Sequence, residues 1–232
     1  MNVADFSVLQ ADNETYAIAP HLPCGVVTPD TLRRLAEVAE KYHAPLIKVT
    51  SANRIGIFGL KRDDLETAWS DLGMSPGHLV GLCVRSVRCC PGLGWCKLGQ
   101  RDAMKVGLEL DRRYHGLELP GKMKMAVSGC PINCAEGWVR DVGLYAQGKS
   151  KWVLVVGGNV GSRPRLAEEL ARGFEDDEAV AAVERVVGAY RGAAKKGERL
   201  GRTIERLGLN WLREQTGLAG RSEDSKGSQP SG

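Results

Sequence analysis

The sequence predicts an α+β protein in which a small βαββαβ-type subdomain, residues 1–77, precedes a larger α/β domain, residues 78–218. Short apolar runs bounded by Gly, Pro and Asn alternate with segments of helical periodicity along the chain. The 232 residues are enough for one large domain or two small ones, each with a hydrophobic core. From residue 219 to 232 only the first alanine is apolar, so we expect a disordered tail there.

The first subdomain is predicted to contain four strands and two helices. A strand at 15–21 precedes a helix at 29–44, which begins after the capping residue Thr28 with Pro29 in its first turn. Apolar runs at 45–51 and 54–60 predict two further strands. A second helix at 62–73 ends at Gly73, and a strand at 78–87 completes the pattern. Both helices are expected on one face of the small sheet.

The larger domain is predicted to alternate helices and strands. A helix is expected at 97–116, followed by a strand at 122–128 in which lysines alternate with apolar residues. A short helix after Cys134 comes before strands at 141–147 and 151–158. Two helices, 176–194 and 199–215, close the domain.

Composition and charge exclude several classes of protein. The N-terminus carries acidic residues and no apolar core, so we do not expect a signal peptide, and the apolar stretch at 152–156 is far too short to span a bilayer. We therefore expect a cytoplasmic protein without a membrane partner. The net charge of +4 is mild and no nucleic-acid motif is present, so no nucleic-acid partner is expected. Seven cysteines, an odd number, make a closed set of disulfides unfavourable.

Four cysteines form two short pairs that predict a metal centre. Cys90 and Cys96 are separated by five residues, Cys130 and Cys134 by three, and 33 residues lie between the pairs. Both pairs lie in loops with Pro and Gly, which let the backbone curl around an iron–sulfur cube held by four thiolates. The alternatives are core cysteines and a structural zinc site, whose pairs prefer shorter gaps.

Cys24, Cys83 and Cys89 are predicted to be structural. Cys83 and Cys89 are also separated by five residues, but they lie on an expected strand that would place them about 20 Å apart.

These residues resemble the siroheme- and [4Fe-4S]-containing sulfite and nitrite reductases, and the small single-repeat assimilatory-type sulfite reductases most of all. The resemblance covers nearly the whole chain, through "HLPCGVVT", "TSANRIGIFGL", "SGCPINCAEGWVRDVGLYA" and "GGNVGSRPR". It implies a ferredoxin-like first subdomain followed by a siroheme/[4Fe-4S] domain. It also implies that Cys90, Cys96, Cys130 and Cys134 hold the cluster, with Cys134 shared with the siroheme iron. An expected helix after Cys134 would stabilise its thiolate.

The resemblance further implies cationic residues around a small oxyanion and around the siroheme carboxylates. The expected anion-binding residues are His21, Arg85, Lys122 and Lys124. Arg54, Asn159 and Arg163 are expected to contact siroheme. Lys122 and Lys124 should share one strand face. The alternatives are a solvated lysine face, a surface Arg85 and a structural His21.

The implied function is the six-electron reduction of sulfite to sulfide by an enzyme with an external one-electron donor, such as a ferredoxin-like protein. The residues at 191–206 carry a basic run that is either a solvated helical face or a docking surface for an acidic donor. Sulfite is preferred because nitrite enzymes of the family tend to replace one lysine of the K-x-K pair, and both are present here. Nitrite reduction to ammonia and a non-catalytic [4Fe-4S] electron-transfer or sensor subunit remain the alternatives.

Overall fold

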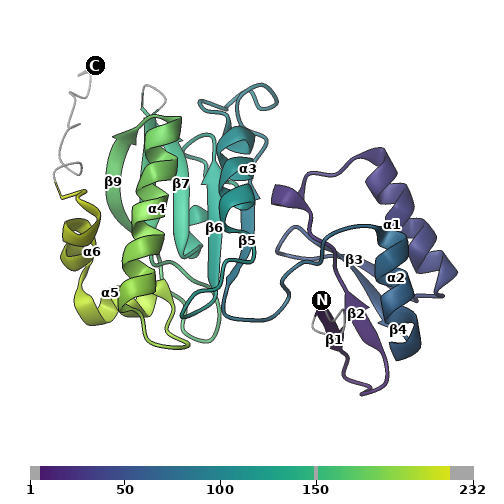
Figure 1. The fold of residues 1–232 in the computed structure, drawn as a ribbon. Coiled ribbons are helices and arrows are strands. Elements are labelled where there is room, and N and C mark those ends of the chain that lie inside the picture. The colour runs from purple at the N-terminus through teal and green to yellow at the C-terminus, as the bar shows by residue number, and fades with distance from the viewer. Residues whose placement is uncertain (1–5, 149–150, 220–232) are drawn as a thin grey trace.

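The protein folds around two β-sheets that follow one another along the chain (Figure 1). The computed structural model describes residues 6–148 and 151–219. A four-stranded sheet has the order β1-β2-β4-β3, and a five-stranded sheet has the order β5-β6-β7-β8-β9. Helices α1 and α2 accompany the first sheet, and α3 to α6 accompany the second (Figure 1).

The first sheet is antiparallel throughout. Its strands are β1 (Ser7–Leu9), β2 (Tyr16–Ile18), β3 (Leu46–Val49) and β4 (Ile55–Leu60). Helices α1 (Pro29–Lys41) and α2 (Leu65–Leu72) pack against it through a core that includes Ile18, Leu35, Ile57 and Leu72.

Local signals explain both helices of this first unit. Thr28 caps α1, because its hydroxyl accepts a hydrogen bond of 3.1 Å from the backbone N–H of Thr31. Gly73 ends α2 in the left-handed conformation, as its position predicted.

The first sheet differs from the predicted pattern at both ends of the unit. Strand β1, which was not predicted, is only three residues long and pairs with β2. The strand predicted at 78–87 begins later, as β5 (Val84–Cys89), and pairs with β6 in the second sheet. The residues just before it form turns, because Gly81 adopts a positive φ of 106°. The small unit therefore ends without a strand after α2.

The second sheet begins with three parallel strands and ends with two antiparallel ones. These are β5, β6 (Met123–Ser128), β7 (Val142–Gln147), β8 (Lys151–Val156) and β9 (Glu168–Phe174). Helices α3 (Ala103–Tyr114) and α4 (Asp176–Ala193) cover one face of this sheet (Figure 1). The main core lies between these helices and the sheet, and it includes Met123, Met125, Leu144, Trp152 and Tyr190.

Three predictions for this half were wrong in detail. Strand β9 was missed, since "EELARGF" has few of the β-branched residues that mark strands. The helix predicted at 199–215 is two helices, α5 (Leu200–Leu207) and α6 (Leu209–Thr216), because Gly208 has a φ of 89°. The helix expected after Cys134 is a 3₁₀ turn of three residues, Gly137–Val139. Within the described ranges, no helix is long and apolar enough to cross a membrane.

Side chains and backbone connect the two units directly. His21 Nε2 lies 2.7 Å from Asp111 Oδ2 on α3. The Arg54 guanidinium donates to the carbonyl of His78 at 3.0 Å and to that of Arg85 on β5. A 3₁₀ turn at Pro23–Gly25 packs against α3 and β5. The first unit is thereby held beside the edge strand of the second sheet.

Candidate functional site

The two cysteine loops meet at one edge of the second sheet. Cys90 directly follows β5, and Cys130 comes shortly after β6, the neighbouring parallel strand. Carboxyl ends of adjacent parallel strands lie at the same edge, so the loops start side by side. The Gly129 N–H lies 3.1 Å from Cys90 Sγ, and the Gln100 N–H donates to the Gly129 carbonyl at 2.7 Å. The structure therefore packs the second cysteine loop directly on the first.

Glycine makes this close approach possible. A Cβ added at Gly129 would lie 2.5 Å from the Arg101 carbonyl oxygen and 2.9 Å from Gly92 Cα. Both neighbours are backbone atoms of the first loop, which cannot rotate away as a side chain would. Gly92 itself has a φ of 66°, in the left-handed region. The positions of these glycines are thus set by contact between the loops.

The thiols have the chemistry of a cluster donor set. All seven cysteines are free; among the four predicted ligands, Cys130 is buried, Cys90 half-buried, and Cys96 and Cys134 exposed. Burial raises the pKa of Cys90, the N–H groups of Gly129 and Gly92 oppose this, and charge on Cys134 and Cys130 raises it further. Three of the four thiols are therefore within electrostatic reach of one another.

The spacing of these thiols bears on the kind of metal centre. Among residues 6–148 and 151–219, no three His, Cys, Asp or Glu side chains converge tightly enough to hold a single metal ion. A four-iron cube needs a wider spacing, because each thiolate binds a different iron. Free thiols on two packed loops fit such a cube in donor chemistry, and the ligand set stays a prediction.

A polar network fixes the turn that carries Cys130 and Cys134. The Asn133 side-chain oxygen accepts from the Gly137 N–H at 3.0 Å and lies 3.0 Å from Ser128 Oγ. Ser128 Oγ also accepts from the Ala135 N–H at 3.0 Å. Asn133 has a φ of 57°, which asparagine tolerates better than most residues. The three-residue 3₁₀ turn beyond is too short to supply the helix-terminus stabilisation of the Cys134 thiolate that the sequence predicted.

A cluster of cations occupies the helix-free face of β5 and β6. Met123 and Met125 are fully buried toward α3, whereas Lys122 and Lys124 alternate with them and are half-buried. Burial lowers the pKa of Lys124. Four nearby cations lower it further, in the order Arg140, Arg199, Lys122 and Arg85. The predicted lysine pair and Arg85 therefore belong to one positively charged surface, which we call the cationic face: Arg85, Arg88, Lys122, Lys124, Arg140 and Arg199.

Unpaired donors on this face show that it fits a polyanionic group. In the part of the chain that the structure describes, the buried atoms Arg88 Nε and Arg140 Nε have no hydrogen-bond partner. Arg88 and Arg140 share a single carboxylate, Glu136, so their positive charge exceeds what the protein supplies to balance it. Buried polar groups are rarely left without partners. A carboxylate-rich tetrapyrrole such as siroheme would satisfy these donors.

A cavity of about 300 Å³ lies beside the cationic face and contains three of the predicted residues. Its charged and polar lining residues are Lys122, Asn159, Ser162, Arg163, Arg199 and Arg202. Asn159 and Arg165 exchange two backbone hydrogen bonds, of 2.9 and 3.0 Å, which shape the turn between them. Lys122, Asn159 and Arg163 are thus brought together from segments far apart in the sequence. Arg199 and Arg202 were predicted only as members of the basic run at 191–206, either a solvated helical face or a docking surface.

Asp141 is a buried carboxylate that contacts two residues of the cationic face. The sequence did not identify it as a site residue. Its side chain is 1% exposed and accepts from Arg199 Nε at 3.0 Å and Arg199 Nη2 at 2.5 Å. It also accepts from the Lys124 backbone N–H at 2.8 Å. Burial raises the pKa of Asp141, while the Arg199 guanidinium holds it down. One buried carboxylate therefore orients a cavity arginine and the backbone of a predicted anion-binding lysine.

Arg54 and His21 lie where the two units meet. Arg54 is 6% exposed, and burial followed by the charge of Arg85 lowers its pKa. His21 stacks on His115 at 3.4 Å between ring centroids and contacts Asp111, and it does not line the 300 Å³ cavity. The structure thus places Arg54 next to the cationic face through Arg85, and places His21 in a separate histidine cluster.

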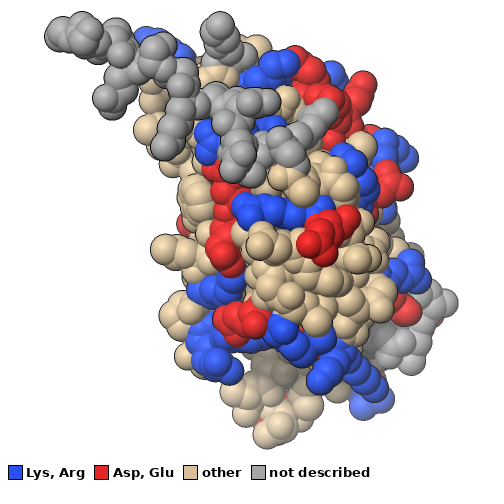
Figure 2. All heavy atoms as spheres, turned by 90° about the vertical axis from the view of Figure 1, so that its left-hand side faces the viewer, with Lys and Arg blue, Asp and Glu red and all other residues tan. Residues whose placement is uncertain are grey.

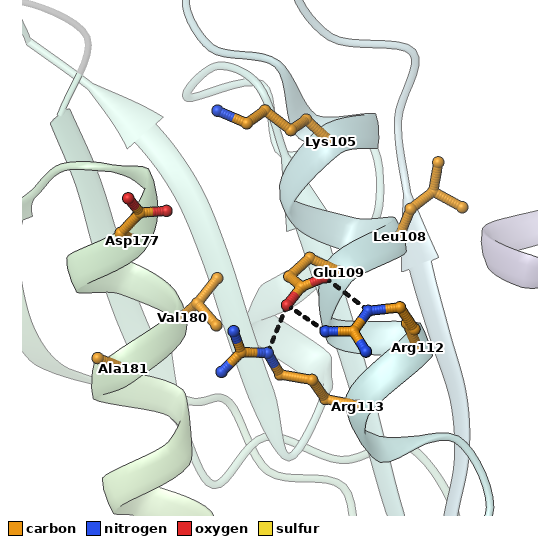
Figure 3. A pocket seen from close by; sticks show the side chains of 8 residues that line it. All are labelled: Lys105, Leu108, Glu109, Arg112, Arg113, Asp177, Val180 and Ala181. Atoms are coloured by element: carbon orange, nitrogen blue, oxygen red, sulfur yellow. Dashed lines mark hydrogen bonds and ion pairs between the residues drawn. The ribbon is translucent and has the colours of Figure 1, made fainter.

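A larger cavity of about 650 Å³, between α3 and α4, contains none of the predicted residues (Figure 3). Glu109 pairs with both Arg112 and Arg113 on its floor, as the dashed lines show. Lys105 is paired with Asp176 nearby. Among the described residues, none of the buried side-chain atoms without a hydrogen-bond partner belongs to the lining of this cavity, so it offers no counterpart to the unpaired donors of the cationic face.

Known proteins match both halves of the chain. Residues 8–75 match the family described as "Nitrite/Sulfite reductase ferredoxin-like half domain", and residues 80–221 match "Nitrite and sulphite reductase 4Fe-4S domain". The assimilatory-type sulfite reductase of Nitratidesulfovibrio vulgaris is 38% identical over 90% of this chain and 95% of that protein. The NAD(P)H nitrite reductase of Bacillus subtilis is 37% identical over 84% of this chain but only 24% of its own length.

Solved structures of low identity share the fold. Dissimilatory sulfite reductase I has a TM-score of 0.79 at 16% identity, covering 94% of this chain and 72% of that one. The NirA protein of Mycobacterium tuberculosis has a TM-score of 0.77 at 20% identity, covering 92% and 43%. The predicted α+β class with a ferredoxin-like first half is confirmed. The chain belongs to the nitrite and sulfite reductase family, which confirms the predicted family and its cofactors, siroheme and a [4Fe-4S] cluster.

Proposed function

We propose that this protein reduces sulfite to sulfide with electrons supplied one at a time by an external donor. The observation that carries the proposal is the cationic face, with its unpaired buried donors, on the two strands that lead into the cysteine loops. The similarity to an assimilatory-type sulfite reductase over 95% of that protein supports the same activity for a chain of this size.

Each group of residues has a definite task in this proposal. Cys90, Cys96, Cys130 and Cys134 would hold the cluster, and Cys134 would also contact siroheme. Arg54, Asn159 and Arg163, together with Arg88 and Arg140, bind the siroheme carboxylates. When bound, the cluster and siroheme would pass the donor's electrons to the substrate.

Lys122 and Lys124, with Arg85, bind the oxyanion and stabilise charge that develops on its oxygens. Lys124 is suited to proton donation, because burial and neighbouring cations lower its pKa and make its proton easier to lose. Lys122 faces the same side and can take up the same role for a second oxygen. His21, also predicted to bind the anion, is held by Asp111 in the histidine cluster where the two units meet, and we assign it no task in the anion site.

The donor is a one-electron carrier protein, and the pairing of three cations within the basic run at 191–206 makes that run less suited to dock it. Arg199, Arg202 and Arg206 of that run pair with Asp141, Glu205 and Glu198. Figure 2 shows positive and negative side chains interspersed on the side of the molecule that carries α6. Such a surface produces little net attraction for an acidic partner.

Anaerobic purification followed by turnover assays tests the proposal. We expect siroheme absorption bands together with iron and labile sulfide, and sulfide release when reduced viologen and sulfite are supplied. Ammonia release from nitrite at a higher rate would favour nitrite as the substrate, as the similarity to nitrite reductases allows. Cluster content without siroheme bands and without turnover on either anion would instead identify an electron-transfer or sensor subunit.

A further inference from the structure

Two thiols outside the predicted cluster set meet where the two units join. Cys24 lies in the 3₁₀ turn Pro23–Gly25 of the first unit, and Cys89 is the last residue of β5 in the second sheet. Both are free thiols, and a Cβ built on Gly107 of α3 would lie 3.2 Å from Cys24 Sγ and 3.4 Å from Cys89 Sγ, so the two sulfurs border the same small space. Cys24 is 4% exposed, whereas Cys89 is half-buried. The two thiols therefore lie near each other at the junction between the two halves of the protein.

The surrounding backbone holds these sulfurs in place. A Cβ added at Gly107 on α3 would lie 2.8 Å from Cys89 Cβ and 3.2 Å from Cys24 Sγ. Glycine at this helix position leaves room for both cysteines. Cys24 has a φ of 52°, in a turn closed by the Gly25 N–H to Leu22 and the Val26 N–H to Pro23, each 2.9 Å. The two thiols are thus confined to one small space between a turn, a strand end and a helix.

We propose that Cys24 and Cys89 form a reversible disulfide when the protein meets a low-molecular-weight disulfide such as oxidised glutathione. The thiolate of Cys89, the more exposed of the two, attacks one sulfur of the oxidant and releases one glutathione thiolate. The thiolate of Cys24 then attacks Cys89 Sγ and releases the second glutathione. Two protein thiols lose two electrons and two protons in all, and the oxidant becomes two glutathione thiols.

This disulfide would lock the first unit onto the second. The contacts between the units include hydrogen bonds and ion pairs, such as His21 with Asp111 and Arg54 with the β5 carbonyl of Arg85, and the packing of the Pro23–Gly25 turn on α3 and β5. A covalent bond between Cys24 and Cys89 restricts the unfolded chain and raises the melting temperature. It also fixes the residue immediately before Cys90, a predicted cluster ligand. The bond needs only the fold, so its test is separate from that of the proposed activity.

The test uses holoprotein purified without oxygen and equilibrated in glutathione buffers from reducing to oxidising. Thiol–disulfide exchange is stopped by acid, free thiols are alkylated, and disulfides are mapped by tandem mass spectrometry. We expect a loss of two hydrogens per chain and a cross-link between Cys24 and Cys89, both reversed by excess reduced glutathione. The melting temperature should rise with the cross-linked fraction.

Cys83 provides a matched control, because the charged groups that act on its thiol are Arg85, Arg54 and Glu118 and not another cysteine. Cys83→Ser should leave the cross-link intact, while Cys24→Ser and Cys89→Ser should each abolish it. The map of the wild-type chain decides the matter even where a serine variant fails to fold. A wild-type chain that stays reduced at every glutathione ratio, or that cross-links through Cys83 or a predicted cluster cysteine, would overturn the proposal.

Discussion

Replacing Asp141 with asparagine removes the buried carboxylate beneath the cationic face. The Asp141 side chain is 1% exposed, and its partner Arg199 is 16% exposed. Asparagine keeps the shape and one oxygen for the Lys124 N–H, but it carries no charge to balance the guanidinium. Removing one partner of a buried ion pair costs about 3–5 kcal/mol of unfolding free energy. Because Arg199 can partly reach water, we expect Asp141→Asn to cost about 3 kcal/mol, at the lower end of that range.

Urea unfolding followed by circular dichroism measures this loss. Glu205→Gln is the matched control, since it breaks the pair with Arg202, in which the side chains are 27% and 41% exposed. An exposed pair of this kind contributes less than about 1 kcal/mol. Adding Arg199→Met to Asp141→Asn should recover most of the stability, because no charge is then left buried without a partner. A loss below about 1 kcal/mol for Asp141→Asn would refute the assignment of Asp141 as the anchor of Arg199.

Three further changes test the site and its surroundings. Lys122→Ala should lower turnover on sulfite by about 10²-fold while leaving the siroheme absorption bands in place, since it removes charge stabilisation from the anion site. Lys61→Ala, on an exposed loop, should change neither, and loss of the bands in Lys122→Ala would show a structural role instead. Gly129→Ala should lower cluster content, because its Cβ meets backbone of the facing cysteine loop; Gly188→Ala, which meets open space in α4, should not. Equal cluster content in both variants would contradict the packing argument. Burial and neighbouring positive charge lower the pKa of His115 to about 3 in the folded protein, whereas its pKa in the unfolded chain is about 6.5. Between these two pH values the unfolded chain therefore binds one proton more than the folded protein. Stability should therefore fall as pH drops through this window, and it should fall less in His115→Gln. The urea midpoint of each protein is measured at pH 7 and at pH 5, and an equal decrease in the two proteins would contradict this.

Local sequence signals predicted those parts of the fold that depend on neighbouring residues. The cap at Thr28 and the terminator at Gly73 located both helices of the first unit. Alternation in "KMKM" correctly placed Lys122 and Lys124 on the face opposite the buried methionines. Strand β5 was assigned to the wrong sheet, because apolar periodicity identifies a strand but not its pairing partner.

The supporting residues of the site could not be predicted, since their partners are distant in sequence. Asp141 and Arg199 are 58 residues apart, and His21 and Asp111 are 90 apart. No spacing rule connects such residues, and a strand aspartate gives no signal of the arginine it will meet. The sequence could propose the cysteine pairs because each pair is local and the chemistry of four thiolates is specific, and the ligand set stays a prediction. Contact between the two loops became evident only from the parallel pairing of β5 and β6.

The most direct test asks whether the two cysteine loops hold one cluster that shares a thiolate with siroheme. It uses Mössbauer spectroscopy of protein purified without oxygen from cells grown on isotopically enriched iron. The account predicts magnetic splitting of the cluster irons by the siroheme iron, because a shared sulfur couples the two centres. Independent signals from cluster and siroheme, or an iron signal from only one of them, would contradict it.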